Sequence, residues 1–568
     1  MNKTILLAIL FSLSIFSFSQ SFVTPTTPSL YISFIGCIFG GVLLIAQRVK
    51  RPTIGFSKSE GIFILFLTLF LVISSFQENV SPEYFLSGIS LFLLYAVVRR
   101  IEINRSWLPT GFTLLGIVQA AYGLGQYLHW LPSYNDIFDI CGSFDNPAGF
   151  AASLVVLFPF ALQLIGEKPY YRKGLGVLGA LMMIAAIVLS QSRSGMIAIA
   201  VVTGIWGYLC FGGNRLRQWR RGLKITVSAI AIIALVAGLY FLKKDSANGR
   251  LLIWQSSARM IIDKPLLGHG VGGFQREYML YQADFFRHHT DSSLAMLADI
   301  VKHPFNEYLL LLVEQGITGA LLFGAFIYLL VKVYRRKPGT EKRYAALSLI
   351  GVGLFACFSY PMNYPFVRMM AVFCAAVIMR DEGLWWTISR SISGIVKSAA
   401  IVLCLGLLAV SGKMCYDEYR WCDIAHRSLA GETQQVMPDY SRLYKTMRRN
   451  ALFVYNYGAE LNYIGEWEKS NILLQKCALL YNDIDLQLIL ADNYQQQGQF
   501  RQAERCLLLA HQMIPNRFIP LYRLALLYKE TGRPNRARAL AGVIIRKPIK
   551  IMSPEVMSIK AEMKELVR

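Results

Sequence analysis

A polar stretch of this chain reads NGRLLIWQ at residues 248–255, MIIDKPLLGHGVGGF at 260–274 and VKHPFNEYLLLLVEQGITG at 301–319. It lies between long apolar runs and contains arginines, carboxylates, a glycine-rich turn and the histidines His288, His289 and His303. Polar and ionisable groups held at a membrane boundary are costly and are usually functional. We therefore expect the chemistry of the chain to take place in this stretch.

The apolar runs indicate a membrane protein. Of the 568 residues, 54% are hydrophobic, and the mean hydropathy is +0.42, which is high for a soluble chain. Runs long enough to cross a bilayer as helices predict about thirteen spans, at residues 4–20, 29–47, 60–76, 83–98, 108–128, 148–166, 174–190, 194–211, 222–242, 306–332, 344–362, 366–380 and 398–414. The first run also resembles a signal peptide, which leaves its cleavage open.

Basic residues in the short loops predict the orientation of these spans. Lysines and arginines follow every even-numbered span, as Arg99 and Arg100 follow the fourth. The positive-inside rule assigns such loops to the cytoplasm. We therefore expect a multi-pass protein of the bacterial inner membrane, whose loops at 129–147, 191–194, 243–305 and 361–365 are extracytoplasmic. Topology and contact with membrane lipids explain much of the net charge of +23, so no nucleic-acid partner is implied.

The tail after residue 414 is polar and repetitive. Tyr494 and Tyr528 lie 34 residues apart, as do Gly498 and Gly532, and Ala503 and Ala537. A weaker copy contains Tyr457, Gly465 and Trp467. This spacing resembles that of tetratricopeptide repeats, in which two helices pack across a turn at glycine. About three such repeats predict a stacked helical scaffold or a docking surface for a protein partner.

These patterns together predict an all-α protein. Residues 1–414 form a polytopic helical membrane domain with a large extracytoplasmic loop at 243–305. Residues 415–568 are expected to form an extracytoplasmic domain, an α-solenoid of helix-turn-helix repeats.

Short motifs that are far apart in the sequence all lie at the predicted outward surface. They are GSFDNP (142–147), SRSG (192–195), GR-x-x-x-W (249–254), the PLLG–GVGGF turn (265–274) and NEYLLLLVEQGITG (306–319). In order and spacing they resemble the O-antigen ligase and O-antigen polymerase superfamily of membrane glycosyltransferases, over roughly residues 110–380. Members of this superfamily take a glycan from a polyprenyl-diphosphate carrier at the outer leaflet and transfer it to an acceptor.

The resemblance departs from the family pattern at one position. The family usually has histidine immediately before the asparagine that corresponds to Asn306, whereas this chain has Phe305 there. His303 lies two residues earlier, and Pro304 indicates that it precedes the helix. We therefore expect His303 to be the catalytic base, with His288 and His289 as the alternatives. If His303 has only a structural role, it caps the start of the helix.

Arginine is expected to bind the diphosphate of the donor. A guanidinium stays charged and binds phosphate oxygens in a fork, so it can replace a divalent cation. We expect Arg193 and Arg250 to have this role, although each could instead lie at the lipid headgroups. Neither a metal nor another cofactor is expected. The supporting residues would be Asn146, Arg259, Lys264, Asn306 and Glu307.

The resemblance leaves the acceptor open. Lipid A–core is the acceptor that we expect, which would make the protein an O-antigen ligase-like enzyme of lipopolysaccharide biosynthesis. The alternatives are a protein hydroxyl, as in an O-oligosaccharyltransferase, or another glycan, as in a polymerase. A transporter of lipid-linked glycans would show internal repeats between its halves, and a non-enzymatic assembly scaffold would leave the polar stretch unexplained.

Overall fold

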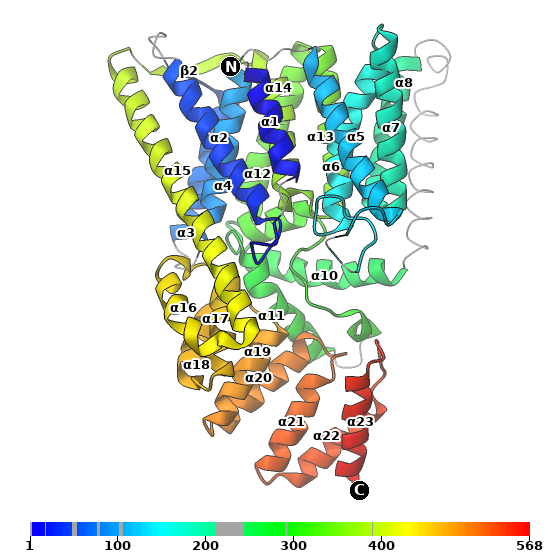
Figure 1. Cartoon of the computed structure of the whole chain (residues 1–568), viewed down its shortest axis with the longest axis vertical. Helices are drawn as coiled ribbons and strands as arrows, with labels where there is room; N and C mark the ends of the chain where they lie inside the picture. The colour runs from blue at the N-terminus through cyan, green and yellow to red at the C-terminus, as the bar shows by residue number, and fades with distance from the viewer. Residues whose placement is uncertain are drawn as a thin grey trace.

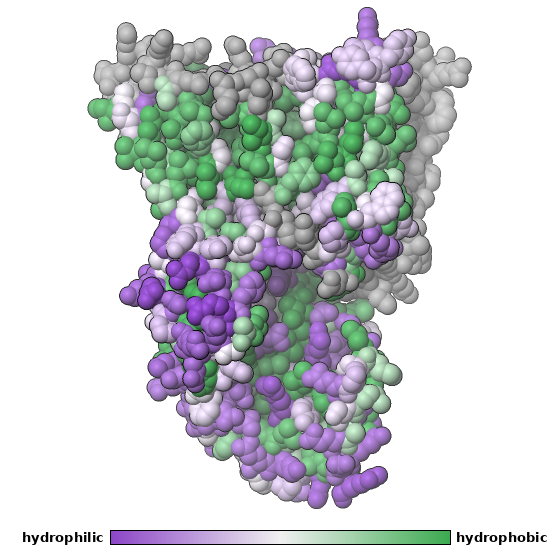
Figure 2. Space-filling view, in the orientation of Figure 1, coloured by the Kyte–Doolittle hydropathy of each residue, from purple (hydrophilic) through white to green (hydrophobic). Residues whose placement is uncertain are grey.

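The computed structural model describes residues 3–16, 19–47, 54–75, 80–101, 106–133, 135, 137–211, 244–289, 293–388 and 390–568. A bundle of long helices forms one end of the molecule, and shorter helices of the C-terminal region form the other (Figure 1). On the face shown in Figure 2, hydrophobic side chains cover the bundle, whereas hydrophilic side chains dominate the C-terminal helices. This division matches the change in composition that the sequence shows after residue 414 and is consistent with an all-α membrane protein.

The bundle contains the predicted spans as helices. They are α1 (Lys3–Phe16), α2 (Thr27–Gln47), α3 (Lys58–Ser75), α4 (Pro82–Arg100), α5 (Trp107–Tyr127), α6 (Pro147–Ile165), α7 (Tyr170–Leu189), α8 (Arg193–Phe211), α12 (Glu307–Arg336), α13 (Thr340–Ala356), α14 (Pro365–Ile378) and α15 (Arg390–Arg427). Among the described residues, six stretches are long and apolar enough to cross a membrane, at Thr27–Ala46, Pro147–Ile165, Tyr170–Leu189, Arg193–Cys210, Glu307–Arg336 and Gly394–Met447. The expected span at 222–242 lies outside the described residues, so the predicted number of spans stays a prediction.

Helix α6 is the centre of the bundle. Its side chains are apolar on every face, and 89% of its apolar window is buried, more than in the other candidate spans. Helices α5, α7, α13 and α14 pack around it. A helix that is hydrophobic all round needs this complete enclosure, and its N-terminus is thereby fixed at one end of the bundle.

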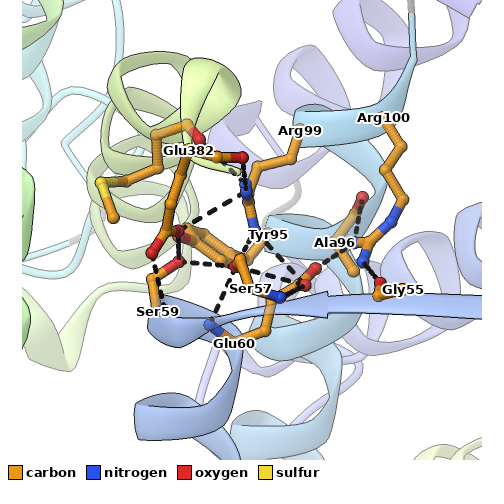
Figure 3. A network of polar contacts seen from close by, with 10 residues as sticks. Gly55, Ser57, Ser59, Glu60, Tyr95, Ala96, Arg99, Arg100 and Glu382 are labelled. Carbon is orange, nitrogen blue, oxygen red and sulfur yellow. Dashed lines mark hydrogen bonds and ion pairs between the residues drawn. The ribbon is translucent and has the colours of Figure 1, made fainter. Parts of the chain in front are cut away.

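A buried ion-pair network fixes the opposite end. The strand β1 (Ile54–Ser57) pairs in antiparallel fashion with β2 (Leu384–Ile388), and beside it Arg99 of α4 lies 3.4 Å from Glu60 and 3.5 Å from Glu382 (Figure 3). Arg100 also pairs with Glu60. Removing one partner of a buried pair leaves an uncompensated charge, so this network ties α3 and α4 to the segment after α14.

Helix α12 is interrupted at Gly316. The backbone there has φ 61° and ψ −162°, and the turn at residues 265–270 fills the gap. His269 and Gly270 donate backbone N–H groups to the carbonyls of Val313 (2.7 Å) and Glu314 (2.8 Å), while Ile317 donates to Pro265 (2.8 Å). The apolar span thus consists of two half-helices whose free backbone groups are satisfied by the PLLG turn.

Replacing Gly316 with alanine is expected to destabilise the protein. Only glycine adopts this backbone conformation without strain, which otherwise costs about 1–3 kcal/mol. A Cβ atom at residue 316 would also lie 2.4 Å from the carbonyl oxygen of Leu266. The midpoint of thermal unfolding in detergent should therefore fall.

Gly324→Ala is the matched control for this substitution. Gly324 belongs to the same helix, and a Cβ atom there meets nothing within 4 Å. The exchange should stabilise slightly, because alanine is the better helix former. Equal unfolding midpoints for the two variants would show that Gly316 carries no special constraint.

The segment between the bundle and the C-terminal helices is itself helical. α10 (Lys244–Asp263) lies across the end of the bundle, and α11 (Gly273–His288) leads from it toward the C-terminal helices (Figure 1). A short helix, η2 (Ser293–Leu297), precedes the chain segment that returns to α12.

The C-terminal helices form successive pairs. They are α16 (Thr433–Met447), α17 (Ala451–Tyr463), α18 (Trp467–Ala478), α19 (Ile484–Gln496), α20 (Phe500–Met513), α21 (Ile519–Glu530), α22 (Pro534–Arg546) and α23 (Pro554–Val567). Gly465, Gly498 and Gly532 have positive φ at the turns within three of the pairs. Each pair has the helix-turn-helix form expected from the 34-residue spacing, and the assignment to tetratricopeptide repeats stays a prediction. The expected boundary at residue 414 lies inside α15, which connects the two ends of the molecule (Figure 1).

Candidate active site

Five segments that are distant in the sequence meet where α10 crosses the end of the bundle. They are the starts of α6 and α8, the first part of α10, the loop before α12 and the loop before α14. Three contacts link four of them: Asn146 with Tyr364, His303 with Tyr360, and Arg250 with Phe305. The start of α8 brings the charge of Arg193, which acts on Arg250. We call these six residues, together with Arg193, the polar–aromatic cluster.

Asn146 fixes one side of this cluster. Its Oδ1 atom accepts hydrogen bonds from the backbone N–H groups of Ala148 (2.8 Å) and Gly149 (3.2 Å), so it caps α6. Pro147 at the first helical position fits this start, because proline has no N–H group to satisfy. The same oxygen accepts a hydrogen bond from the hydroxyl of Tyr364 at 2.8 Å. The cap therefore also places the loop before α14.

His303 lies in the loop before α12, as Pro304 predicts. The helix begins at Glu307, and Asn306 caps it by accepting from the N–H groups of Tyr308 and Leu309, both at 3.0 Å. The His303 imidazole stacks on the Tyr360 ring, with centroids 4.5 Å apart and planes 18° apart. Burial lowers the pKa of His303 to about 4, and the nearby charge of Lys302 acts in the same direction. His303 is therefore neutral at pH 7 and has a lone pair that can accept a proton.

Phe305 occupies the position at which the family pattern has histidine. Its φ of 53° is unusual for a residue other than glycine. Its ring meets the Tyr360 ring edge to face at 5.4 Å, and the Arg250 guanidinium lies 5.2 Å from its centroid. Phe305 thus fills the space between the expected base and an expected phosphate-binding residue.

Arg250 lies within the electrostatic influence of Arg193. Burial and the charge of Arg193 together lower the pKa of Arg250 to about 10, while Tyr360 opposes the shift. Arg250 still carries its proton at pH 7. Two neighbouring guanidinium groups repel each other, and an anion bound between them would relieve this repulsion. The arrangement suits a diphosphate, whose oxygens accept forked hydrogen bonds from arginine.

Glu307 holds the tyrosine loop. Its Oε1 atom accepts a hydrogen bond from the backbone N–H of Met362 at 2.9 Å. Met362 belongs to the short turn Pro361–Asn363, which separates Tyr360 from Tyr364. Glu307 therefore connects the start of α12 to the loop that contains Tyr360, on which His303 stacks.

Other expected residues make their contacts along α11. Arg259 lies 3.6 Å from Asp284, and Lys264 lies 3.7 Å from Glu277. His288 and His289 lie at the exposed end of α11, where their Nδ1 atoms approach the carbonyls of Asp284 and Phe285. None of the contacts described for these four residues reaches the polar–aromatic cluster.

The sequence analysis missed Tyr360 and Tyr364. Both occur in SYPMNYP at residues 359–365, where two Tyr-Pro pairs interrupt an apolar region. That signal marks an outward loop with aromatic side chains, but it does not show that the loop contacts Asn146 and His303. These contacts arise from the packing of α14 against α6.

His269, which was also not selected, has a clear structural role. Its imidazole is fully buried, with Nδ1 2.5 Å from Glu277 Oε2 and Nε2 2.8 Å from the carbonyl oxygen of Met260. Burial alone would raise the pKa of Glu277, but hydrogen bonds from His269 and Arg276 lower it to about 2. The pair holds the turn that fills the gap in α12.

The low pKa of His303 leads to a prediction for the pH dependence of kcat/KM. A general base works only while it is unprotonated, and kcat/KM reports the ionisation of the free enzyme. Because the pKa of His303 is about 4, kcat/KM should stay level as the pH falls below the ordinary histidine value of about 6.5. It should decline only as the pH approaches 4.

Thermal stability measured at each pH separates this decline from unfolding. An acid limb near pH 6.5 in a protein that is still folded would mean that the essential group is not His303 in the environment seen here.

Comparisons with known proteins show which proteins the chain is similar to. Residues 178–324 match the family described as O-antigen ligase. The chain is 25% identical over 328 residues to "Exopolysaccharide production protein ExoQ" of Rhizobium meliloti, a match that covers 52% of this chain and 72% of that protein. It is 27% identical over 152 residues to "Putative polysaccharide ligase" of Rickettsia conorii, covering 26% of this chain and 32% of that protein.

The fold and these similarities support a membrane glycosyltransferase of the polysaccharide ligase type. More narrowly, they support the O-antigen ligase superfamily. The part of this chain that matches the family model runs from α7 into α12. Arg193, Arg250, His303 and Phe305 all lie within the matched residues.

Proposed function

We propose that this protein transfers a glycan from a polyprenyl-diphosphate carrier to an acceptor hydroxyl at the outer face of the bacterial inner membrane. The acceptor in this proposal is lipid A–core, as in an O-antigen ligase. The observation that carries the proposal is the position of Arg250 against Phe305, whose ring meets the Tyr360 ring on which the neutral His303 stacks. A diphosphate leaving group needs positive charge, and an attacking hydroxyl needs a base.

In the proposed reaction, Arg250 and Arg193 bind the oxygens of the diphosphate. The neutral imidazole of His303 accepts the proton of the acceptor hydroxyl as its oxygen attacks the anomeric carbon of the donor glycan. The bond between that carbon and the phosphate oxygen breaks, and the electron pair remains on the departing polyprenyl diphosphate. The two guanidinium groups stabilise the charge that develops there.

The aromatic residues have a positioning role in this scheme. Stacking on Tyr360 fixes the plane of the His303 ring, and Phe305 supports the Arg250 guanidinium from one side. A cation over an aromatic face is held by the quadrupole of the ring. Both contacts restrict these side chains before the donor binds. Less conformational entropy is therefore lost on binding.

The proposed location follows from the two ends of the bundle. Arg99 and Arg100 end α4 and contact Ser57 and Gly55 of β1, and the β1–β2 sheet lies at the end of the bundle far from α10 (Figure 1). The positive-inside rule assigns that end to the cytoplasm. The polar–aromatic cluster and the C-terminal helices are then periplasmic, where the outer-leaflet donor is accessible.

The fate of glycans in a strain that lacks the gene tests the acceptor. A ligase predicts lipid A–core without polysaccharide, together with full-length glycan on its lipid carrier. Loss of glycan from proteins would instead indicate an O-oligosaccharyltransferase, and products with a single repeat unit would indicate a polymerase. Turnover by the purified protein with a lipid-linked donor distinguishes all three from a transporter or a scaffold.

A further inference from the structure

The segment that carries His303 is held by the C-terminal helices. It runs from η2 (Ser293–Leu297) to Pro304 and links the extracytoplasmic helices α10 and α11 to α12. At its start, the side-chain amide of Asn516 donates hydrogen bonds to the carbonyl oxygens of Ala295 (2.9 Å) and Ala298 (2.6 Å). Asn516 lies between α20 and α21, more than two hundred residues further along the chain.

Apolar contacts strengthen this attachment. Ala298 is 1% exposed and Val301 is 8% exposed, and both belong to a hydrophobic core that includes Met513 and Leu524 of the C-terminal helices. The same core includes Phe274 and other residues of α11. The side chains of Ala298 and Val301 therefore anchor the segment before His303 in a core that α11 shares with the C-terminal helices.

Charged groups add a weaker contact. Asp299 lies 3.4 Å from Arg517 and 3.5 Å from Lys550, and Lys550 also donates to the carbonyl of Ala298 at 3.3 Å. Because Asp299 is about half exposed, water and salt screen these pairs. Most of the attachment must come from Asn516 and the apolar core.

The far end of the segment is fixed as well. The indole N–H of Trp254 in α10 donates to the carbonyl oxygen of Pro304 at 2.9 Å. Residues 299–303 are thus confined between Asn516 on one side and Trp254 on the other. A displacement of about 1 Å in a reacting group can cost about a hundredfold in rate, so the position of this segment matters for His303.

We infer that Asn516 is a positioning residue for His303 and that the C-terminal helices hold the catalytic segment as a clamp. The inference rests on the proposed function only for the role of His303. Asn516 is 6% exposed, so its amide depends on the two carbonyls of the segment for its hydrogen bonds. The carbonyls in turn lose their buried donor when the side chain is removed.

Hydrogen–deuterium exchange of the full-length protein tests the clamp itself. In Asn516→Ala, the amides of residues 298–303 should exchange about 10–100-fold faster, because a buried donor with two acceptors is removed. In a transfer assay with a lipid-linked donor, kcat should fall about tenfold while the KM for the donor stays within about twofold. This split is expected because the arginines that bind the diphosphate are unchanged.

Asn462→Ala is the matched control. The Asn462 amide also donates two hydrogen bonds, to Asp492 (2.7 Å) and Asn493 (2.9 Å), but both acceptors lie within the C-terminal helices. Exchange at 298–303 and kcat should stay as in the unmodified protein. If Asn516→Ala does not fold, Lys550→Met offers a milder change that removes contacts to Ala298 and Asp299, and it should shift exchange and kcat in the same direction.

Unchanged exchange at 298–303 in folded Asn516→Ala would overturn the clamp. Faster exchange with unchanged kcat, in an enzyme that His303→Ala inactivates, would overturn the positioning role. A fully active His303→Ala variant would instead contradict the proposed function, while the exchange measurement would still report whether the clamp exists.

Discussion

Replacing His303 with alanine should lower the rate of glycan transfer by about 10²–10⁴-fold, the usual contribution of a general base. His303 is the expected base because its neutral imidazole stacks on Tyr360 beside Arg250 and Phe305. The measurement is single-turnover transfer by purified variants with one lipid-linked donor. Binding of the donor should change little, because in the proposed reaction the arginines bind the diphosphate.

His288→Ala and His289→Ala are the controls for this prediction. Both residues lie at the exposed end of α11 and contact backbone carbonyls of their own helix. Their activity should stay close to that of the unmodified protein. The double variant His303→Ala/Phe305→His asks whether histidine at the family position restores the base. If His303→Ala alone keeps nearly full activity, the proton of the acceptor must leave by another route.

Arg193→Lys and Arg250→Lys should each lower activity by about 10–100-fold, because hydrogen bonds to charged groups contribute about 1.5–3 kcal/mol each. Lysine keeps the positive charge but cannot form the planar fork that binds two phosphate oxygens. At residue 250 the exchange also removes the guanidinium from the Phe305 ring. Steady-state kinetics over a range of donor concentrations measures the effect.

Arg259→Lys is the matched control on α10. Arg259 lies beside Asp284 and the Phe285 ring rather than within the polar–aromatic cluster, so the same substitution should be almost silent. EDTA should leave the unmodified enzyme active if arginines replace a metal. Activity that EDTA abolishes and magnesium or manganese restores would contradict this metal-independent mechanism.

Local sequence signals predicted the ends of the helices well. The apolar run at 148–166 predicted the position of α6, which begins at Pro147. Pro304 predicted that His303 precedes α12, and this is confirmed. Caps and prolines act on the backbone within one turn, so neighbouring residues are sufficient to identify them. The helical pairing in the tail is similarly visible, because the glycines at its turns recur at a fixed spacing.

Contacts between distant segments were harder to predict. Nothing near Tyr360 in the sequence indicates that it stacks on His303, and the apolar run through Gly316 gives no sign that α12 is interrupted. The clamp of Asn516 on Ala298 likewise depends on how α20 packs against α11. Such features depend on the packing of helices in three dimensions, which hydrophobic periodicity in one segment does not determine.

Because α12 is interrupted at Gly316, each half of the helix is positioned independently of the other. Adding one residue to a continuous helix rotates everything beyond it by about 100°. Here the hydrogen bonds from Ile317 to Pro265 and from His269 to Val313 set each half against the PLLG turn separately. Insertions or deletions between Ile317 and Arg336 would therefore change the second half of α12 without rotating Asn306 and His303. The second half can thus vary in length while the geometry of the candidate site stays the same.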